Sequence, residues 1–380
     1  MAHHKVTYLD YQATTPVADE VLDAMLPYFS KNFGNPHSTQ HEIGLHSAAA
    51  VENAREKVSK LVNCEPDEII FTSGATESNN FAIKSIAENY FSTKPQIVTA
   101  RTEHKCVIES CHYLEKKGYD VKYLNVNQDG LINLEELEQL IKIKPSLVSI
   151  MHTNNEIGVV QPIEQIALMC DVYNSVYHCD AAQTFAWTSL DVTKNAIHAA
   201  SISGHKFYAP KGIGALYIKR EIKNVLKPII DGGGQEQGLR SGTLATPLVV
   251  GLGKAADMTL KHHIHYYEHY LRLQQYLLHK LKSENIHFEI NGSLQNRSVH
   301  NLNISINNLP SSQLIMGQKE IAISSGSACT SGAIEKSHVL TALGLDDDRV
   351  ENAFRISWGR ETTEKDLDNL IFMIKKMSKK

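Results

Sequence analysis

The sequence predicts an α/β fold with a mostly parallel sheet covered by helices, followed by a smaller second domain. Short β-rich runs alternate with helical patterns between residues 64 and 219. Such alternation predicts a parallel sheet, because each crossover helix packs back onto one face of it. The second observation is the length, since 380 residues are more than one simple core usually holds.

Seven runs have the composition of strands: residues 68–72, 96–100, 121–125, 146–150, 175–178, 199–203 and 214–218. Helical spacing of apolar residues predicts helices at 78–90 and 134–141, and a long one between Pro247 and Glu284. More strands and helices follow from His287. We therefore expect a large domain with a seven-stranded sheet at 16–258, and a small α+β domain formed by 1–15 and 259–380.

Composition and charge exclude several classes of protein. The net charge is −4 and there is no basic stripe, so nucleic acid and anionic membranes are not expected partners. No apolar run approaches the roughly 20 residues of a membrane span. The first residues lack the apolar core of a signal peptide. Six cysteines without paired spacing indicate a reducing compartment, the cytoplasm.

A metal site is not expected. His262, His263, His265 and His269 have helical spacings, and pairs of histidines four residues apart can share a metal ion. No third ligand motif accompanies them, and the tyrosines between them suggest a mixed amphipathic helix.

Polar side chains follow five of the predicted strands at the point where each strand ends. Ligands of open α/β sheets bind beyond the carboxyl ends of the strands. These polar positions are Ser73 to Glu77, Glu103 and His104, Asn154 to Glu156, Asp180 and Gln183, and Ser203, His205 and Lys206. Five such ends together predict one ligand site.

The first of these ends has the character of an anion cradle. Gly74 permits a tight turn, and Ala75 and Thr76 would present backbone N–H groups at the start of a helix. A phosphate is favoured there by the free N–H groups and the helix dipole. The alternative is an ordinary N-cap, in which Ser73 or Thr76 satisfies backbone donors.

Asp180 and Lys206 are the candidates for cofactor chemistry. A carboxylate at the end of an apolar strand is costly unless it is paired. A protonated ring nitrogen, as in pyridoxal phosphate, is one such partner for Asp180, and a helix N-cap before Ala181 is the alternative. Lys206 leaves a strand beside Ser203 and His205, where a pocket that lowers its pKa would allow a Schiff base.

These residues lie within a series of motifs that resembles the NifS/IscS-type cysteine desulfurases, which are class V, fold-type I pyridoxal-phosphate-dependent transferases. The matching segments run nearly end to end and keep the family's order: 8–16, 32–36, 71–78, 103–105, 154–158, 178–183, 203–206, 238–243, 324–330 and 355–360. The resemblance implies pyridoxal 5′-phosphate as cofactor and a homodimer.

The resemblance also implies a role for each matching residue. Lys206 would bond to the cofactor, Asp180 would pair with its ring nitrogen, and His104 would stack on the ring and help to move protons. Asn155 and Gln183 would contact the ring and its phenolic oxygen. The phosphate would be held by Ala75, Thr76, Ser203 and His205, together with Thr243 from the second subunit. Asn35, Asn155 and Arg355 would bind the substrate carboxylate.

The implied reaction is the removal of sulfur from L-cysteine, which gives L-alanine and a persulfide on Cys329. The catalytic residues would be Lys206, Cys329 and His104, with Cys329 on a loop at about 324–335. An Fe–S scaffold or another sulfur acceptor would be the partner, and the persulfide could transiently ligate a cluster. Two other activities are compatible with the sequence: a selenocysteine or cysteine-sulfinate lyase, and a largely non-catalytic subunit of a sulfur-transfer complex.

Two positions depart from the family pattern. Ala209 replaces a common glycine, which we expect to be tolerated. The sequence stops at Lys380 without the tail that IscS-type members use to dock a scaffold, so docking by that route is not expected.

Overall fold

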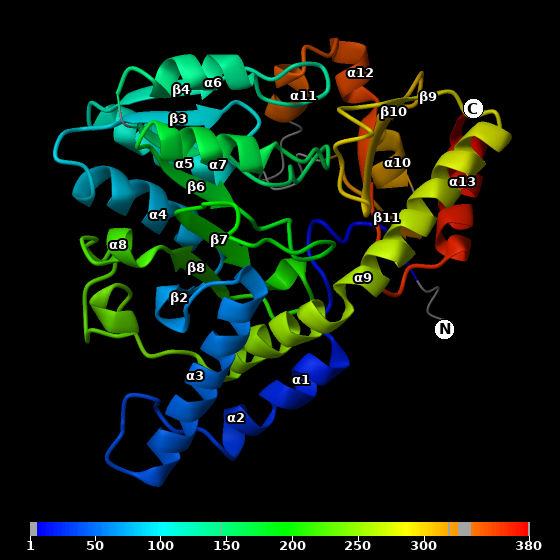
Figure 1. Ribbon diagram of the computed structural model, residues 1–380. Coiled ribbons are helices and arrows are strands. Elements are labelled where there is room, and N and C mark those ends of the chain that lie inside the picture. The colour runs from blue at the N-terminus through cyan, green and yellow to red at the C-terminus, as the bar shows by residue number, and fades with distance from the viewer. Residues whose placement is uncertain (1–5, 145, 318–319, 326–335, 379–380) are drawn as a thin grey trace.

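The structure is a computed structural model that describes residues 6–144, 146–317, 320–325 and 336–378. A large sheet with its helices forms one part, and a smaller sheet packed on α13 forms the other (Figure 1). The long helix α9 (Thr246–Ser283) runs from the first part to the second.

The large sheet has the predicted seven strands, in the spatial order β2-β8-β7-β6-β5-β3-β4. Six strands run in one direction and β8 runs against both of its neighbours. The strands are β2 (Ile69–Thr72), β3 (Gln96–Ala100), β4 (Asp120–Leu124), β5 (Ser146–Ser149), β6 (Val176–Asp180), β7 (Ala199–Ser203) and β8 (Gly214–Ile218). The prediction of a mostly parallel α/β sheet is confirmed.

Alternate residues of each strand enter different cores, as the period of two requires. Ile70, Ile97 and Leu147 pack under α4 (Ala75–Asn89) and α5 (Lys105–Lys116) on one face. Their sequence neighbours face the larger core on the other side. That core is covered by α1 (Asp19–Met25), α3 (Glu42–Val62), α6 (Leu134–Ile141), α7 (Ile163–Val172) and the first half of α9.

Local signals explain where several helices begin and end. Asn133 is the N-cap of α6, and its Oδ1 accepts the backbone N–H of Glu135 at 2.8 Å. Helix α3 ends at Asn63 in the left-handed conformation, with φ of 56°. The remaining short elements of the first part are α2 (Pro27–Ser30), α8 (Arg220–Lys223), η1 (Pro66–Glu68), η2 (Gly204–Lys206) and η3 (Glu236–Gly238).

The second part is built on an antiparallel sheet in the order β12-β10-β9. Its strands are β9 (Phe288–Ile290), β10 (Asn301–Ile306) and β12 (Ala353–Ser357), with α10 (Ser311–Gly317), α11 (His338–Ala342), α12 (Asp347–Glu351) and α13 (Glu364–Ser378). A parallel pair of β1 (Thr7–Tyr8) and β11 (Ile321–Ala322) attaches the start of the chain.

Helix α9 contributes to both cores. Val249, Leu252 and Ala256 are buried in the large core, whereas Tyr270 and Leu277 are buried in the second core with Leu9 and residues of β10, β12 and α13. The domain bounds 16–258 and 259–380, with 1–15 added to the latter, stay a prediction.

Two glycines allow the backbone to come close at the edge where the site lies. Gly74 has φ of 149°, in a region that L side chains rarely adopt, and α4 begins at the next residue. A Cβ on Gly214 would lie 2.6 Å from the Cα of Gly74 and 2.4 Å from the carbonyl oxygen of Ile202. The carboxyl ends of β2 and β7 can therefore approach the start of β8.

Candidate active site

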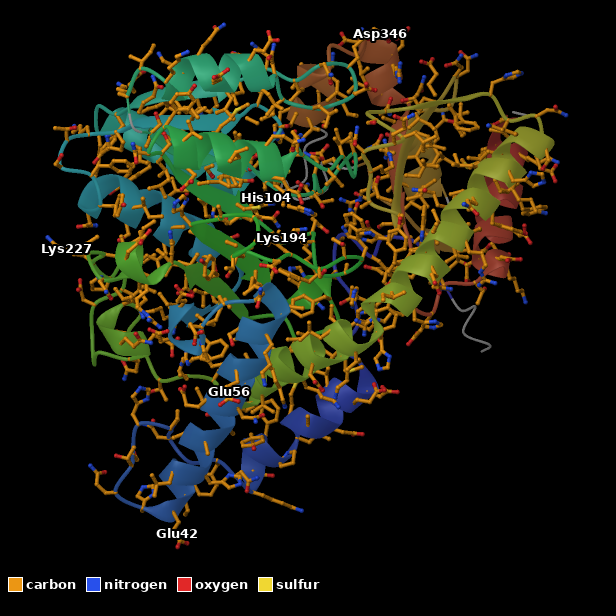
Figure 2. All side chains as sticks on the ribbon, viewed as in Figure 1. Glu42, Glu56, His104, Lys194, Lys227 and Asp346 are labelled. Atoms are coloured by element: carbon orange, nitrogen blue, oxygen red, sulfur yellow. The ribbon has the colours of Figure 1, made fainter. Side chains whose placement is uncertain are left out.

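The predicted strand-end residues do come together at one edge of the large sheet. Asp180 is the last residue of β6, Ser203 is the last of β7, and Lys206 ends the short helix that follows β7. His104 precedes α5, near the centre of the molecule between the large sheet and the second part (Figure 2). All four lie at or just beyond the carboxyl ends of β3, β6 and β7, which run in the same direction.

Lys206 is partly buried beneath the start of the chain. Its Nζ donates hydrogen bonds to the carbonyl oxygens of Gln12 at 2.6 Å and Ala13 at 2.8 Å. The segment that contains Gln12 and Ala13 is itself fixed, since Thr15 donates to the carbonyl of His205 through both its backbone N–H and its hydroxyl. The contacts of Gln12 and Ala13 with the lysine were not anticipated from the sequence.

Asp180 is 5% exposed and is held by two donors. Its Oδ1 accepts the N–H of Ala182 at 2.9 Å, and its Oδ2 accepts from Asn79 Nδ2 at 2.7 Å. The first bond resembles the predicted cap, but it stabilises a turn and not a helix. Asn79 was missed, although it follows Ala75 by four residues and so shares its face of α4.

Buried polar atoms around this centre have no partner among the described residues. They include Oδ1 of Asn155 and Oε1 of Gln183, whose Nε2 donates to the carbonyl of Gln12 at 3.0 Å. An unsatisfied buried acceptor costs about 1–3 kcal/mol. A pyridoxal ring placed between Asp180 and Lys206 would pair its ring N–H with Asp180, and its phenolic O–H, when protonated, would donate to one of these amide oxygens, so the residues fit pyridoxal phosphate.

The start of α4 and the end of β7 fit the phosphate. The N-cap of α4 is Gly74, which has no side chain to cap the helix, and not Ser73 or Thr76. Ser203 is buried, whereas Thr76 is exposed. His205 Nδ1 lies 3.1 Å from Thr14 Oγ1. Burial, helped by Lys206 and Lys211, lowers the pKa of His205 to about 4, so its ring is neutral near pH 7.

His104 is the N-cap of α5 and contacts Cys106 in the first turn of that helix. Its Nδ1 accepts the backbone N–H of Cys106 at 3.2 Å and lies 3.0 Å from the Cys106 sulfur. Burial lowers the pKa of His104, and this outweighs the opposing effect of the Asp180 charge. No role was predicted for Cys106 from the sequence, and its place beside His104 was missed.

Arg355 is buried in β12 and is already engaged by two groups. Its Nη2 forms an ion pair with Asp10 at 2.6 Å, and its Nη1 donates to the carbonyl of Asn155 at 2.6 Å. Its Nε is buried without a partner among the described residues. The predicted pair of Arg355 and Asn155 is therefore in contact, while Asp10 is an addition from the structure.

Asn35 and Thr243 lie apart from this centre, on exposed loops. The Asn35 side chain accepts the backbone N–H of His37 at 3.0 Å. Pro36 and His37, which follow it, line a cavity of about 440 Å³ together with Glu236, Gln237 and Leu244. The loops that carry Asn35 and Thr243 are thus neighbours on the surface.

Cys329 lies outside the described residues, but both ends of its segment are placed. Ser324 forms an isolated β-bridge with Arg355. After the segment, the Ser337 hydroxyl binds Glu156 at 2.5 Å, and His338 Nε2 lies 2.9 Å from the carbonyl of Glu103. Each of these partners borders the site.

The described part of the chain has neither a metal-binding cluster nor a membrane-spanning helix. No group of three histidine, cysteine, aspartate or glutamate residues there is arranged to hold a metal ion. None of its helices combines the length and apolar character that crossing a bilayer requires.

Comparison with known proteins identifies the family. The aminotransferase class-V family matches residues 7–370. The mitochondrial cysteine desulfurase of Arabidopsis thaliana is 46% identical over 374 residues, 98% of this chain and 82% of that protein. The cysteine desulfurase IscS of Rickettsia bellii is 46% identical over 97% of this chain and 90% of its own length.

Solved structures agree with this. One named NifS-like protein has a TM-score of 0.91 and 36% identity, with 98% of this chain and 99% of the other covered. A structure of SspA in complex with cysteine has a TM-score of 0.82 and 39% identity, covering 94% of this chain and 99% of that one. The chain belongs to the aminotransferase class-V family of pyridoxal-phosphate-dependent enzymes, and within it to the NifS/IscS type.

Proposed function

We propose that this chain is a cysteine desulfurase that converts L-cysteine to L-alanine and leaves the sulfur as a persulfide on Cys329. The observation that carries the proposal is the convergence of Asp180, His104 and Lys206 at the strand ends of a chain that is 46% identical to a protein of that name. The same constellation fits the cofactor of the family.

The chain's own residues would hold pyridoxal phosphate at three places. Lys206 would bond to it, and Asp180 would face its ring nitrogen. The N–H groups of Ala75 and Thr76, with Ser203 and the neutral His205, would bind its phosphate. Gln183 and Asn155 each have a buried, unpaired amide oxygen, and these amides would contact the polar substituents of its ring. When bound, the cofactor withdraws electrons from the substrate's α-carbon.

Arg355 would bind the substrate carboxylate. Two of its nitrogens are held by Asp10 and the carbonyl of Asn155, so the guanidinium is oriented before substrate arrives. The buried Nε is a donor that remains to be satisfied. A carboxylate at this nitrogen would form a charge-assisted hydrogen bond, which is stronger than a neutral one.

Proton transfer and sulfur transfer would then use two different side chains. The amine of Lys206, once displaced by substrate, would take the proton from the α-carbon. The Cys329 thiolate would attack the substrate sulfur, so that an S–S bond forms while the Cβ–S bond breaks. The electron pair of the broken bond remains with the substrate carbon, which is protonated to give alanine.

A homodimer would complete the site. Thr243 and Asn35 lie on exposed neighbouring loops. The segment that leads from α1 through α2 to the Asn35 loop exposes large apolar side chains, with Leu26 at 52%, Phe29 at 59% and Phe33 at 67%. Exposed apolar side chains grouped in this way mark protein contact sites. We infer that this face meets a second copy and that Thr243 reaches the partner's phosphate.

The sulfur acceptor would be an Fe–S scaffold or another protein that accepts persulfide sulfur. A reducing compartment such as the cytoplasm suits the chemistry, because an unpaired thiol must remain available on Cys329.

A Cys329→Ala variant tests the assignment. We expect it to bind pyridoxal phosphate and cysteine, as seen in the visible absorbance spectrum, while release of sulfide and alanine falls by about 10²-fold or more, because the nucleophile is absent. Cys64→Ala, which removes a thiol at the end of α3, is the matched control and should keep normal turnover. Undiminished sulfide release from Cys329→Ala would refute the assigned thiol.

A further inference from the structure

Four side chains form a continuous hydrogen-bonded chain beneath the site. Asp180 Oδ2 accepts from Asn79 Nδ2 at 2.7 Å, and the same Nδ2 lies 3.1 Å from the Cys106 sulfur. That sulfur lies 3.0 Å from Nδ1 of His104. These hydrogen bonds therefore join Asp180, which would face the cofactor's ring nitrogen, to His104, which would stack on the ring. It begins on β6, crosses α4 and ends at the start of α5.

The orientation of the Asn79 amide is determined by its neighbours. An amide NH₂ group has two hydrogens, and here one is directed to the Asp180 carboxylate and the other to the Cys106 sulfur. Rotating the amide would place its oxygen against the carboxylate oxygen of Asp180, which is repulsive. Asn79 is fully buried, and its Oδ1 has no partner among the described residues.

The Cys106 thiol transmits this orientation to His104. Burial, strengthened by the charge of Asp180, raises the pKa of Cys106 to about 12, so the sulfur keeps its hydrogen at neutral pH. Since the sulfur accepts from Asn79, its own hydrogen is available for Nδ1 of His104. Nδ1 also accepts the backbone N–H of Cys106. Two donors therefore point at Nδ1, which cannot carry a proton itself.

We propose that Asn79 and Cys106 are positioning residues that hold His104 as the neutral Nε2–H tautomer. His104 would then donate a hydrogen bond through Nε2 and stabilise the negative charge left when the substrate's α-carbon loses its proton. Lys206 would be the base that takes this proton. This rests on the proposed function in one respect, namely that His104 faces the cofactor. The side chains of Asn79 and Cys106 bind Asp180, His104 and each other, so they act through those residues and not on the substrate directly.

The charged surroundings of His104 are consistent with a neutral ring. Asp180 from β6 favours the protonated form, whereas Lys206, His338 and Lys105 disfavour it, and burial is the largest influence. The buried Glu103 precedes it in sequence, and burial raises the pKa of that carboxyl well above its usual range.

The tautomer can be read directly by ¹⁵N NMR of the full-length holoenzyme labelled at histidine, with His104→Gln used to identify the signal. We expect wild type and Cys64→Ala to show the Nε2–H form. Cys106→Ala should show a mixture of tautomers and a kcat about fivefold lower with KM for cysteine unchanged, the size expected from one neutral hydrogen bond. Cys106→Ser, which keeps a hydroxyl donor, should restore both.

Asn79 is tested in the same spectra. Asn79→Ala should give a mixture of His104 tautomers, as Cys106→Ala does. The double variant should lower kcat little further than either single variant, because both residues act through the same hydrogen bonds. A protonated or Nδ1–H ring in wild type would overturn the proposal. So would a Cys106→Ala spectrum and kcat equal to those of Cys64→Ala, or equal losses in Cys106→Ala and Cys106→Ser. An Nε2–H ring in a protein that releases no sulfide would instead refute the desulfurase function.

Discussion

The strand-end part of the site and its loop part differ in what holds them. Asp180 and Lys206 are fixed by hydrogen bonds within one chain, from Asn79 and Ala182 in one case and to Gln12 and Ala13 in the other. Asn35 and Thr243 lie on exposed loops, and the Asn35 bond to His37 is local. The fold of one chain alone positions Asp180 and Lys206. Asn35 and Thr243 would become part of a site only through contact with a second subunit.

Lys206→Ala should have the largest effect on the strand-end part of the site. We expect loss of covalently held cofactor and a fall in alanine formation of about 10³-fold or more, because a general base alone contributes about 10² to 10⁴. Borohydride reduction followed by mass measurement would detect the covalent bond. Lys211→Ala, at an exposed position five residues along, is the control and should resemble wild type. Retained activity in Lys206→Ala would remove the lysine from the mechanism.

Thr243→Ala would test whether the exposed loop part contributes to cofactor binding. A hydrogen bond to a charged group contributes about 1.5–3 kcal/mol, so the affinity for pyridoxal phosphate should fall by about 10- to 100-fold. Equilibrium titration of cofactor absorbance measures this, and Thr243→Ser should keep most of the affinity.

Mixed dimers of Thr243→Ala and Lys206→Ala subunits then decide which site Thr243 serves. If it serves the partner, the subunit that keeps Lys206 receives an intact Thr243 and binds cofactor with normal affinity. Weak binding in the mixed dimer would instead place Thr243 in its own subunit's site. A chain that sediments as a monomer would contradict the dimer altogether.

His178 concerns stability and not catalysis, because it is buried in the core under Asp180. Its ring nitrogens bind Ser149 and Ser201 at 2.9 and 3.0 Å, and burial lowers its pKa to about 3. The unfolded chain therefore takes up a proton below about pH 6.5 that the native ring does not. The free energy of unfolding should fall as pH drops from about 6.5 toward 3, by up to about 1.4 kcal/mol per pH unit for this residue.

Urea denaturation between pH 7.5 and 5 measures that slope. His178→Gln should be less stable at pH 7.5 but should show a shallower decline with acid than wild type. His112→Gln, at a partly exposed position, should keep the wild-type slope. Equal slopes in wild type and His178→Gln would show that His178 is not buried as a neutral ring.

Strand positions were predictable because apolar alternation is a local signal. Residues 96–100, 199–203 and 214–218 are strands with the bounds expected. Helix α4 begins three residues earlier than predicted, at Ala75, because the backbone of Gly74 lets a helix start directly after the strand. Strand β6 extends to Asp180, which the sequence placed just beyond its end.

The site was predictable only where a residue matched a motif or ended a strand. Lys206, Asp180 and His104 met both conditions. Asn79 and Cys106 met neither condition, and Asn79 meets Asp180 only through packing between segments 101 residues apart. Asp10 lies in the matched segment 8–16, but no role was predicted for it, because its partner Arg355 is 345 residues away. A polar residue on the inner face of α4 was the one local signal for Asn79.

Helix α9 also determines how this molecule should unfold. Its 38 residues form a rod about 57 Å long, at 1.5 Å per residue. The two cores share this rod, so neither can melt without fraying the helix on which the other packs. Thermal denaturation should consequently show one cooperative transition, in which damage to either core lowers the melting temperature of both.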